Sequence, residues 1–178
     1  MPVHPVSKIQ VSMRQIPKWK RIPNTVIHSK PLMIYHGAFD ASAAELSAHL
    51  KMVGEVVPQW VNTMYSQTHF HSTTHEILGV VAGGARLCFG AEQNPQRFEP
   101  TVHRGDIIIV PTGVGHRLLD DLVEGGEQFK MVGAYPPHKD WDMCYGQPGE
   151  EEQVQGIQNV PWFSRDPLYG NNGPILNV

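Results

Sequence analysis

The sequence is short of charged residues and of cysteine. Aspartate, glutamate, lysine and arginine make up 17% of the 178 residues, against about a quarter in a typical soluble protein, and the formal net charge is only −3. This balance excludes a nucleic-acid-binding protein that relies on a large positive charge. The two cysteines, Cys88 and Cys144, form no CxxC pair, which excludes a disulfide framework and a cysteine-rich zinc site.

Long apolar stretches are also missing. Runs such as residues 107–110 (IIIV) are far shorter than the roughly 18 residues that cross a membrane. The opening residues MPVHP do not begin the apolar core of a secretory signal peptide. We therefore expect a cytoplasmic protein with neither a membrane nor a nucleic acid among its partners.

Proline and glycine, by contrast, are abundant, with 15 and 17 residues. The first segment of the chain contains Pro2, Pro5, Pro17, Pro23 and Pro31. Because proline at this density favours extended backbone over helix, we expect residues 1–31 to form a proline-rich arm, partly a strand, packed along the domain or along a neighbour. Residues 32–178 are then expected to form one domain, including a C-terminal tail that lies over it.

The remaining pattern predicts one helix followed by many short strands. Ser42 and Glu45 have the spacing of a capping box, and apolar residues recur at helical intervals up to Gly54. Strands are expected near residues 32–39, 60–71, 76–82, 85–90, 98–103, 106–110, 116–119 and 127–135, with a tight hairpin at Gly83–Gly84. The predicted fold class is all-β, an antiparallel sandwich or barrel preceded by one short helix.

Histidines gather in one part of the sequence. His69 and His71 are two residues apart in a predicted strand, where both imidazoles lie on the same face. Glu76 follows after a short polar turn, and His116 lies just beyond the turn at residues 111–113. Three imidazoles and one carboxylate suit a divalent transition metal such as Fe, Mn, Ni, Cu or Zn, and suit calcium or magnesium poorly.

These residues also carry a family resemblance. Both sequence motifs of the cupin superfamily match this chain. The first motif matches at His69, His71, Glu76 and Gly83, and the second at Gly105, Pro111, Gly113 and His116. The chain departs from the motifs at Thr63, where a glycine is expected, and at Asp120, where an asparagine is expected. The resemblance implies a cupin antiparallel β-barrel, of the jelly-roll or double-stranded β-helix type. It also implies a metal ion held by His69, His71, Glu76 and His116.

Within the superfamily, the chain resembles the single-domain YjlB-like cupins, over about residues 32–175. The similar stretches are residues 71–80 (HSTTHEILGV), 133–136 (GAYP) and 166–170 (DPLYG). This branch has no settled activity, so the resemblance implies a fold and a metal site without implying a reaction. Exchange of N-terminal strands in cupin barrels implies a homodimer, in which the arm would pair with its neighbour.

The role of residues around the histidines is open at this stage. His75 adjoins Glu76, and a tight turn would let His75 bind the ion while Glu76 acts as a catalytic base. Glu76 is favoured as the ligand because it matches the family position, which leaves His75 as a residue that supports a ligand or forms part of the pocket wall. As a ligand, Glu76 could also release the ion and serve as the catalytic base. Alternation from His69 also sends Gln67 and Tyr65 towards the cavity, and the same reasoning sends inward Leu78, Val80, Leu118 and Asp120.

Three functions fit this site. We favour a metal-dependent enzyme that acts on a small organic molecule, with dioxygenase or oxidative-cleavage chemistry ahead of isomerisation or decarboxylation. The first alternative is a non-catalytic cupin that binds a small molecule and uses the metal for stability. The second is a metal-free isomerase or cyclase of a biosynthetic pathway.

Overall fold

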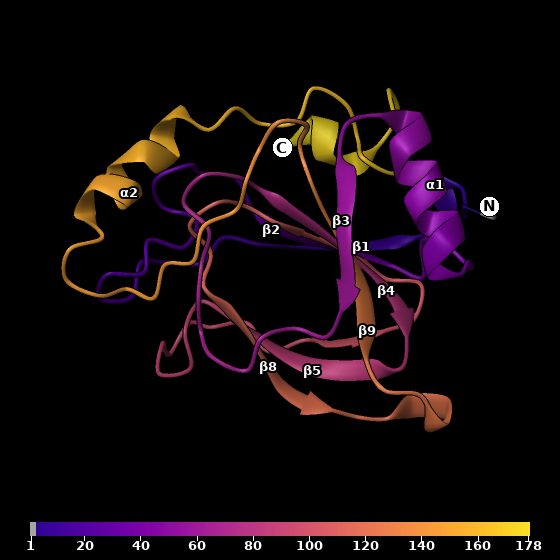
Figure 1. The fold of residues 1–178 in the computed structure, drawn as a ribbon, viewed down its shortest axis with the longest axis horizontal. Helices are drawn as coiled ribbons and strands as arrows, with labels where there is room; N and C mark the ends of the chain where they lie inside the picture. Colours follow the sequence, from indigo (N-terminus) through magenta and orange to yellow (C-terminus); the bar gives the residue numbers. More distant parts are fainter. Residues whose placement is uncertain (1–2) are drawn as a thin grey trace.

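Two antiparallel sheets form the body of the protein in the computed structural model, which describes residues 3–178 (Figure 1). The larger sheet has six strands in the order β1-β2-β7-β4-β9-β3, and the smaller has three in the order β6-β5-β8. The strands are β1 (Gln10–Arg14), β2 (Leu32–His36), β3 (Val57–Asn62), β4 (Glu76–Ala82), β5 (Gly84–Phe89), β6 (Thr101–His103), β7 (Ile107–Val110), β8 (His116–Asp121) and β9 (Lys130–Tyr135). The all-β expectation is confirmed.

Helices are few and lie outside the sheets. The α-helices are α1 (Ala43–Val53) and α2 (Glu151–Gly156), and short 3-10 helices span Val6–Lys8, Glu124–Gly126, Ile157–Asn159 and Pro174–Asn177. The sequence predicted α1 but no helix at the acidic run of residues 150–152. In the structure this run begins α2, where acidic side chains near the N-terminus are favourable. Among the described residues, no helix has the length and apolarity to cross a membrane.

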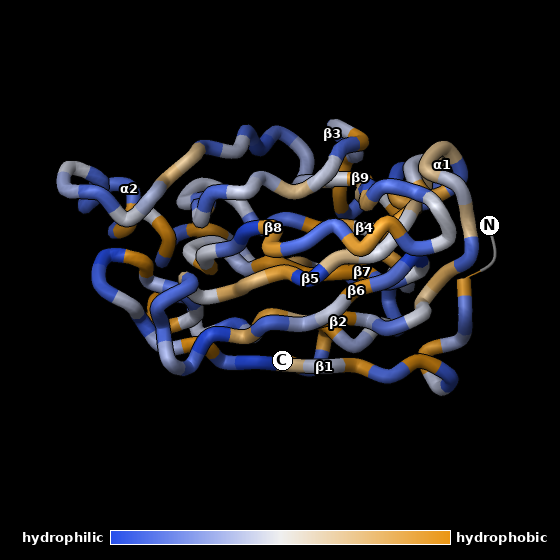
Figure 2. Tube along the Cα trace, turned by 90° about the horizontal axis from the view of Figure 1, so that it is seen from below, coloured by the Kyte–Doolittle hydropathy of each residue, from blue (hydrophilic) through white to orange (hydrophobic). Residues whose placement is uncertain are grey.

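The central strands of the larger sheet, β2, β7, β4 and β9, are buried on both faces, which explains their mostly apolar sequences. In β7, Ile107 and Ile109 pack with α1 and the C-terminal segment, whereas Ile108 and Val110 pack against the smaller sheet. Such a strand shows no alternation of apolar and polar residues, because neither face meets water. In Figure 2 the apolar segments of β4 and β7 accordingly lie at the centre of the molecule.

The first strand belongs to the arm. β1 pairs antiparallel with β2 of the same chain, and the following stretch buries Ile16, Ile22 and Thr25. At the other end of the chain, Phe163, Leu168 and Ile175 join the core beside α1. The strand of the arm thus extends the larger sheet, and the C-terminal segment packs with α1 against that sheet.

Two predictions about the strands are wrong. The strand expected at 60–71 begins earlier and ends at Asn62, and the chain is then irregular up to Glu76 apart from single bridges at His69 and Phe70. The tight hairpin at Gly83–Gly84 is also absent, because β4 pairs with β7 and β9 whereas β5 pairs with β6 and β8. The chain instead crosses between the sheets at Gly83, whose φ of +62° favours glycine.

The N-terminus of α1 forms the capping box that the sequence predicts. The Glu45 amide donates to Ser42 Oγ at 3.3 Å, and the Ser42 amide donates to Glu45 Oε2 at 2.8 Å. We expect Ser42→Ala to lower the free energy of unfolding by about 1 kcal/mol, measured by urea denaturation. Ser47→Ala in the middle of α1 is the control and should cause no loss, because alanine favours helix. Equal stability of the two variants would contradict a stabilising cap.

Candidate metal centre

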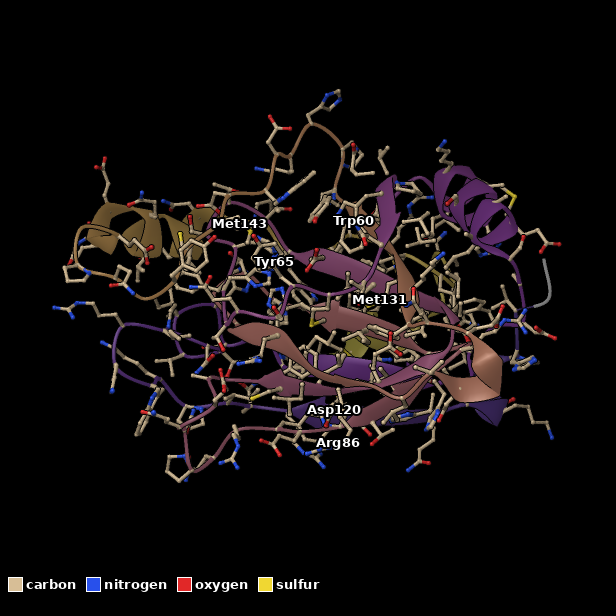
Figure 3. The ribbon with its side chains drawn as sticks, turned by 60° about the horizontal axis from the view of Figure 1, so that its bottom comes forward. Trp60, Tyr65, Arg86, Asp120, Met131 and Met143 are labelled. Atoms are coloured by element: carbon tan, nitrogen blue, oxygen red, sulfur yellow. The ribbon has the colours of Figure 1, made fainter. Side chains whose placement is uncertain are left out.

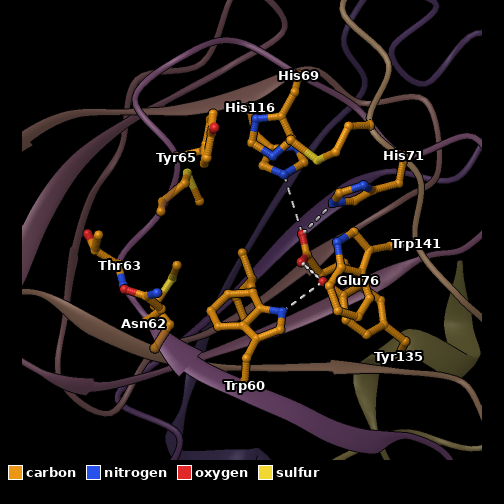
Figure 4. A pocket seen from close by; sticks show the side chains of 14 residues that line it. Trp60, Asn62, Thr63, Tyr65, His69, His71, Glu76, His116, Tyr135 and Trp141 are labelled. Carbon is orange, nitrogen blue, oxygen red and sulfur yellow. Dashed lines mark hydrogen bonds and ion pairs between the residues drawn. The ribbon is translucent and has the colours of Figure 1, made fainter.

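Three histidine side chains converge between the two sheets (Figure 4). His69 and His71 come from the irregular segment after β3, and His116 is the first residue of β8. The His69 and His116 backbones bind each other through two hydrogen bonds of 3.2 and 2.8 Å, which fixes the spacing of these two side chains. One potential ligand atom from each of the three histidines lies within 4.8 Å of the others, and all three residues are buried.

Each of these imidazoles is oriented by its Nδ1 atom. Nδ1 lies 2.9 Å from the Gln67 carbonyl oxygen in His69, 2.6 Å from that of Asp142 in His71, and 2.9 Å from that of Val114 in His116. A carbonyl only accepts, so each Nδ1 carries the donated proton, and Nε2 is the ring atom left to bind a metal ion. Metal-binding histidines are held by carbonyls in this way.

Glu76, the first residue of β4, completes the cluster. Its Oε2 lies 3.4 Å from His71 Nε2 and 3.3 Å from His116 Nε2. Its Oε1 accepts a 2.6 Å hydrogen bond from the Tyr135 hydroxyl, which in turn accepts one of 3.0 Å from Trp60 Nε1. Glu76 Oε2 is buried and accepts no hydrogen bond from the described residues. A buried carboxylate oxygen without a donor fits a bound cation.

The electrostatic surroundings give Glu76 and His69 the protonation states that metal ligands need. Burial raises the pKa of Glu76, but the His71 and His116 imidazoles outweigh burial and hold that pKa well below its usual range. Burial, helped by the charge of His116, lowers the pKa of His69 to about 3. In His71, burial lowers the pKa, but the neighbouring Glu76 carboxylate outweighs burial and raises it. The carboxylate is therefore ionised and the His69 imidazole is neutral at pH 7, as metal coordination requires.

His75 lies outside this cluster. Its Nδ1 accepts a 2.9 Å hydrogen bond from the Thr112 amide, and its Nε2 donates to the Pro161 carbonyl at 3.1 Å. The ring packs edge-on against His28 and Trp162, with centroid distances of 4.7 and 4.8 Å. Burial, then the charge of His28, lowers the pKa of His75 to about 3. Both nitrogens are already engaged, so His75 has no free atom to offer an ion.

Of the other residues predicted to face the cavity, some line it and some do not. Tyr65 lines the cavity, with its ring 5.7 Å from that of His69, although it is 59% exposed. The Gln67 side chain is exposed, and only its carbonyl reaches the site. Alternation fails here because residues 63–68 do not form a strand. Leu78 lines the cavity, while Val80 lies in the core between the sheets.

Asp120 also lies away from the site. Its side chain is 55% exposed and forms a 2.6 Å ion pair with Arg86. In Figure 3 these two residues lie together, far from Trp60, Tyr65 and Met143. The register of β5 against β8 shifts between Arg86 and Leu87, so the alternation that starts at His116 does not continue to Asp120.

A cavity of about 180 Å³ opens beside the cluster. Its lining combines the four clustered residues with mostly aromatic and apolar side chains, namely Trp60, Asn62, Thr63, Met64, Tyr65, Leu78, Met131, Tyr135, Trp141 and Met143. The Trp60 indole lies directly over Gly133, where a Cβ would overlap it. The sequence analysis missed Trp60, Tyr135 and Trp141 as site residues. The one signal for these residues in the sequence is the stretch 133–136, which the family resemblance marks without assigning Tyr135 a role.

Asp142 is a further residue that the sequence analysis missed. Its carbonyl orients His71, while its carboxylate accepts hydrogen bonds of 2.7 Å from the Ser72 amide and 2.5 Å from the Ser72 hydroxyl. Burial raises the pKa of Asp142, but the hydrogen bonds from Ser72 outweigh this and lower it. The loop that carries Trp141 and Met143 is therefore attached to the turn that carries His71.

Comparisons with known proteins match the part of the chain that contains these residues. A family model described as Cupin matches residues 61–119, the segment that contains all four clustered residues. The uncharacterized protein YjlB of Bacillus subtilis is 31% identical over 160 residues, which cover 89% of this chain and 90% of YjlB.

Two solved structures are more distant. A mutant of Bacillus subtilis oxalate decarboxylase is 14% identical with a TM-score of 0.37, covering 82% of this chain and 29% of that chain. The Momordica charantia 7S globulin is 14% identical with a TM-score of 0.35, covering 64% of this chain and 26% of that chain. This chain thus spans less than a third of their length. The family match and the similarity to YjlB over nearly the whole chain show that this all-β protein belongs to the cupin family.

Proposed function

We propose that the protein is a metal-dependent cupin enzyme that acts on a small organic molecule. His69, His71, His116 and Glu76 would hold one divalent transition-metal ion, drawn from Fe, Mn, Ni, Cu and Zn. The observation that supports this most directly is Glu76 Oε2, which is buried without a donor 3.3 and 3.4 Å from two imidazole nitrogens. When bound, such an ion supplies Lewis-acid or redox chemistry at its open coordination positions.

The chain's own residues prepare the site for that chemistry. Tyr135 occupies Glu76 Oε1 and leaves Oε2 directed at the imidazoles. Trp60 holds the Tyr135 hydroxyl from the other side. The mostly apolar lining reduces the water around a ligand in the inner part of the cavity, which strengthens polar interactions there.

The same residues favour oxygenase-like chemistry, such as dioxygenation, over isomerisation. Proton abstraction needs a base with a pKa near the operating pH. Among the buried non-histidine lining residues, Glu76 and Tyr135 could move a proton, but they are hydrogen-bonded to each other. Burial, followed by the charge of Glu76, raises the pKa of Tyr135, so its hydroxyl stays protonated. A reaction whose slow step is electron transfer does not need a proton-abstracting base among these residues.

The proposal includes a homodimer in the cytoplasm. β1 lies at the edge of the six-stranded sheet, where its outer backbone groups are available to pair with another strand. Light scattering of the purified protein measures the mass directly, and a solely monomeric species would contradict the dimer.

Metal content tests the central claim. Untagged protein, purified without added metal or chelator, is expected to hold about one equivalent of a transition metal by mass spectrometry. His69→Ala and His116→Ala should each lose the metal because each removes one imidazole, whereas the exposed His103→Ala control should retain it. Folded wild-type protein that is metal-free and refuses added metal would contradict the proposal and favour a metal-free isomerase or cyclase. Metal that raises only thermal stability would favour the non-catalytic binding protein.

A further inference from the structure

The cavity beside the histidines is walled by aromatic and apolar side chains. Trp60 and Leu78 lie within it, and the thioethers of Met64, Met131 and Met143 contribute further apolar surface. Glu76 is the one acidic side chain of the lining, and no lysine or arginine lines this cavity among the described residues. The wall therefore offers a ligand apolar contact and no fixed positive charge.

Two aromatic side chains at this cavity are also partly exposed to solvent. Trp141 stacks on Tyr135 with a centroid distance of 4.8 Å and an interplanar angle of 12°, yet it remains 42% exposed. Tyr65 is 59% exposed. Exposed aromatic residues around a cavity mark a place where a flat ligand gains contact area by stacking.

The size of the cavity limits the ligand. Its volume is about 180 Å³. An apolar protein cavity of roughly 150 Å³ binds benzene. The space therefore suits one ring with small substituents and is too small for a polycyclic compound enclosed in full.

Charge limits the ligand further. A divalent ion together with the Glu76 carboxylate leaves one net positive charge. A ligand that loses one proton on binding the ion would leave the site neutral. A dicarboxylate would bring a second negative charge against Glu76 and an apolar wall without a cation, which carries a large desolvation cost.

We propose that the cavity selects a planar, ring-bearing compound that chelates the ion through two neighbouring oxygens and carries a single negative charge, such as a catechol or a ring-bearing hydroxyketone. Small dicarboxylates are rejected. The chelating end lies at the histidines, and the ring lies against the wall that includes Trp60 and Trp141. This inference rests on the proposed function, because the ion anchors the chelating end.

Two hydroxamic acids test the ligand class. Benzohydroxamic and acetohydroxamic acid share one singly ionised chelating group and differ by the ring. Zn²⁺-loaded protein, with Zn²⁺ occupancy measured first by equilibrium dialysis, is titrated with each compound in a calorimeter. Benzohydroxamic acid should bind at least about tenfold more tightly, because ring burial is worth that much or more. Equimolar oxalate should not displace it.

Tryptophan variants test where the ring of the ligand binds. Trp141→Ala should weaken benzohydroxamic acid about tenfold and change the affinity for acetohydroxamic acid little, because only the ring loses its contact. Trp19→Ala, which removes an indole from the arm, is the matched control and should change neither affinity. Equal affinities for the two hydroxamic acids, or displacement by oxalate, would overturn the ligand class while metal binding stands. Wild-type protein that takes up no Zn²⁺ would overturn the proposed function and this inference together.

Discussion

His71→Ala is expected to weaken metal binding by at least about 100-fold, whereas His75→Ala should leave the metal affinity within about threefold of wild type. His71 Nε2 is directed at Glu76 Oε2, and its loss would remove an imidazole from the proposed ligand set. Loss of a residue that hydrogen-bonds to a metal ligand typically costs 10- to 100-fold in metal affinity, so loss of a ligand itself should cost at least as much. His75 has both nitrogens hydrogen-bonded elsewhere, so its loss should act on stability.

Competition between the protein and a chromophoric chelator for Zn²⁺ measures the first effect, and thermal denaturation measures the second. His75→Ala should lose about 2–3 kcal/mol of unfolding free energy, because it leaves the buried Thr112 amide and the Pro161 carbonyl without their partner. The reverse result, with metal affinity lost in His75→Ala and kept in His71→Ala, would refute the proposed ligand set. It would support the alternative in which His75 binds the ion and Glu76 acts as a base.

Asp166→Ala is expected to lower the free energy of unfolding by about 3–5 kcal/mol. The carboxylate is fully buried and accepts hydrogen bonds of 2.7 Å from the Tyr35 hydroxyl, 2.9 Å from the Leu168 amide and 3.0 Å from the Tyr169 amide. Alanine would leave these donors unpaired in the interior, and each unpaired donor costs about 1–3 kcal/mol. The C-terminal segment would then lose its main polar attachment to β2.

Urea denaturation measures this effect, with the exposed Asp140→Ala as the matched control, which should remain within about 0.5 kcal/mol of wild type. If Asp166→Ala does not fold, Tyr35→Phe provides a milder change that deletes one hydroxyl, with an expected loss of about 1–2 kcal/mol. An Asp166→Ala variant as stable as Asp140→Ala would show that the buried carboxylate contributes nothing to holding the segment.

The sequence predicted the clustering of His69, His71 and His116 through the spacing of the two motifs, although His69 and His71 lie in an irregular segment and not in the expected strand. It also predicted α1, since a capping box and a C-terminal glycine act through neighbouring residues. It misplaced Gln67 and Asp120 because alternation holds only within a regular strand. One of these residues lies in an irregular segment, and the other lies beyond a register shift.

The missed parts of the site depend on contacts between distant segments. Tyr135 reaches Glu76 from β9, and the Asp142 carbonyl reaches His71 from the following loop. No short-range pattern in the sequence marks either residue, because their positions result from the pairing of β4 with β9 and from the packing of the loop. The resemblance marked residues 133–136 as similar to the family, but it assigned Tyr135 no role.

Gly133 contributes to the cavity through the side chain that it lacks. The Trp60 indole occupies the space where any larger residue would place its Cβ. A single methyl group at this position of β9 would displace the indole and, with it, the hydrogen bond that Trp60 donates to Tyr135. The width of the cavity is thus set partly by a residue outside its lining. Evolution or protein engineering could therefore change the range of ligands by substituting Gly133, which lies behind Trp60, while every side chain that lines the cavity stays the same.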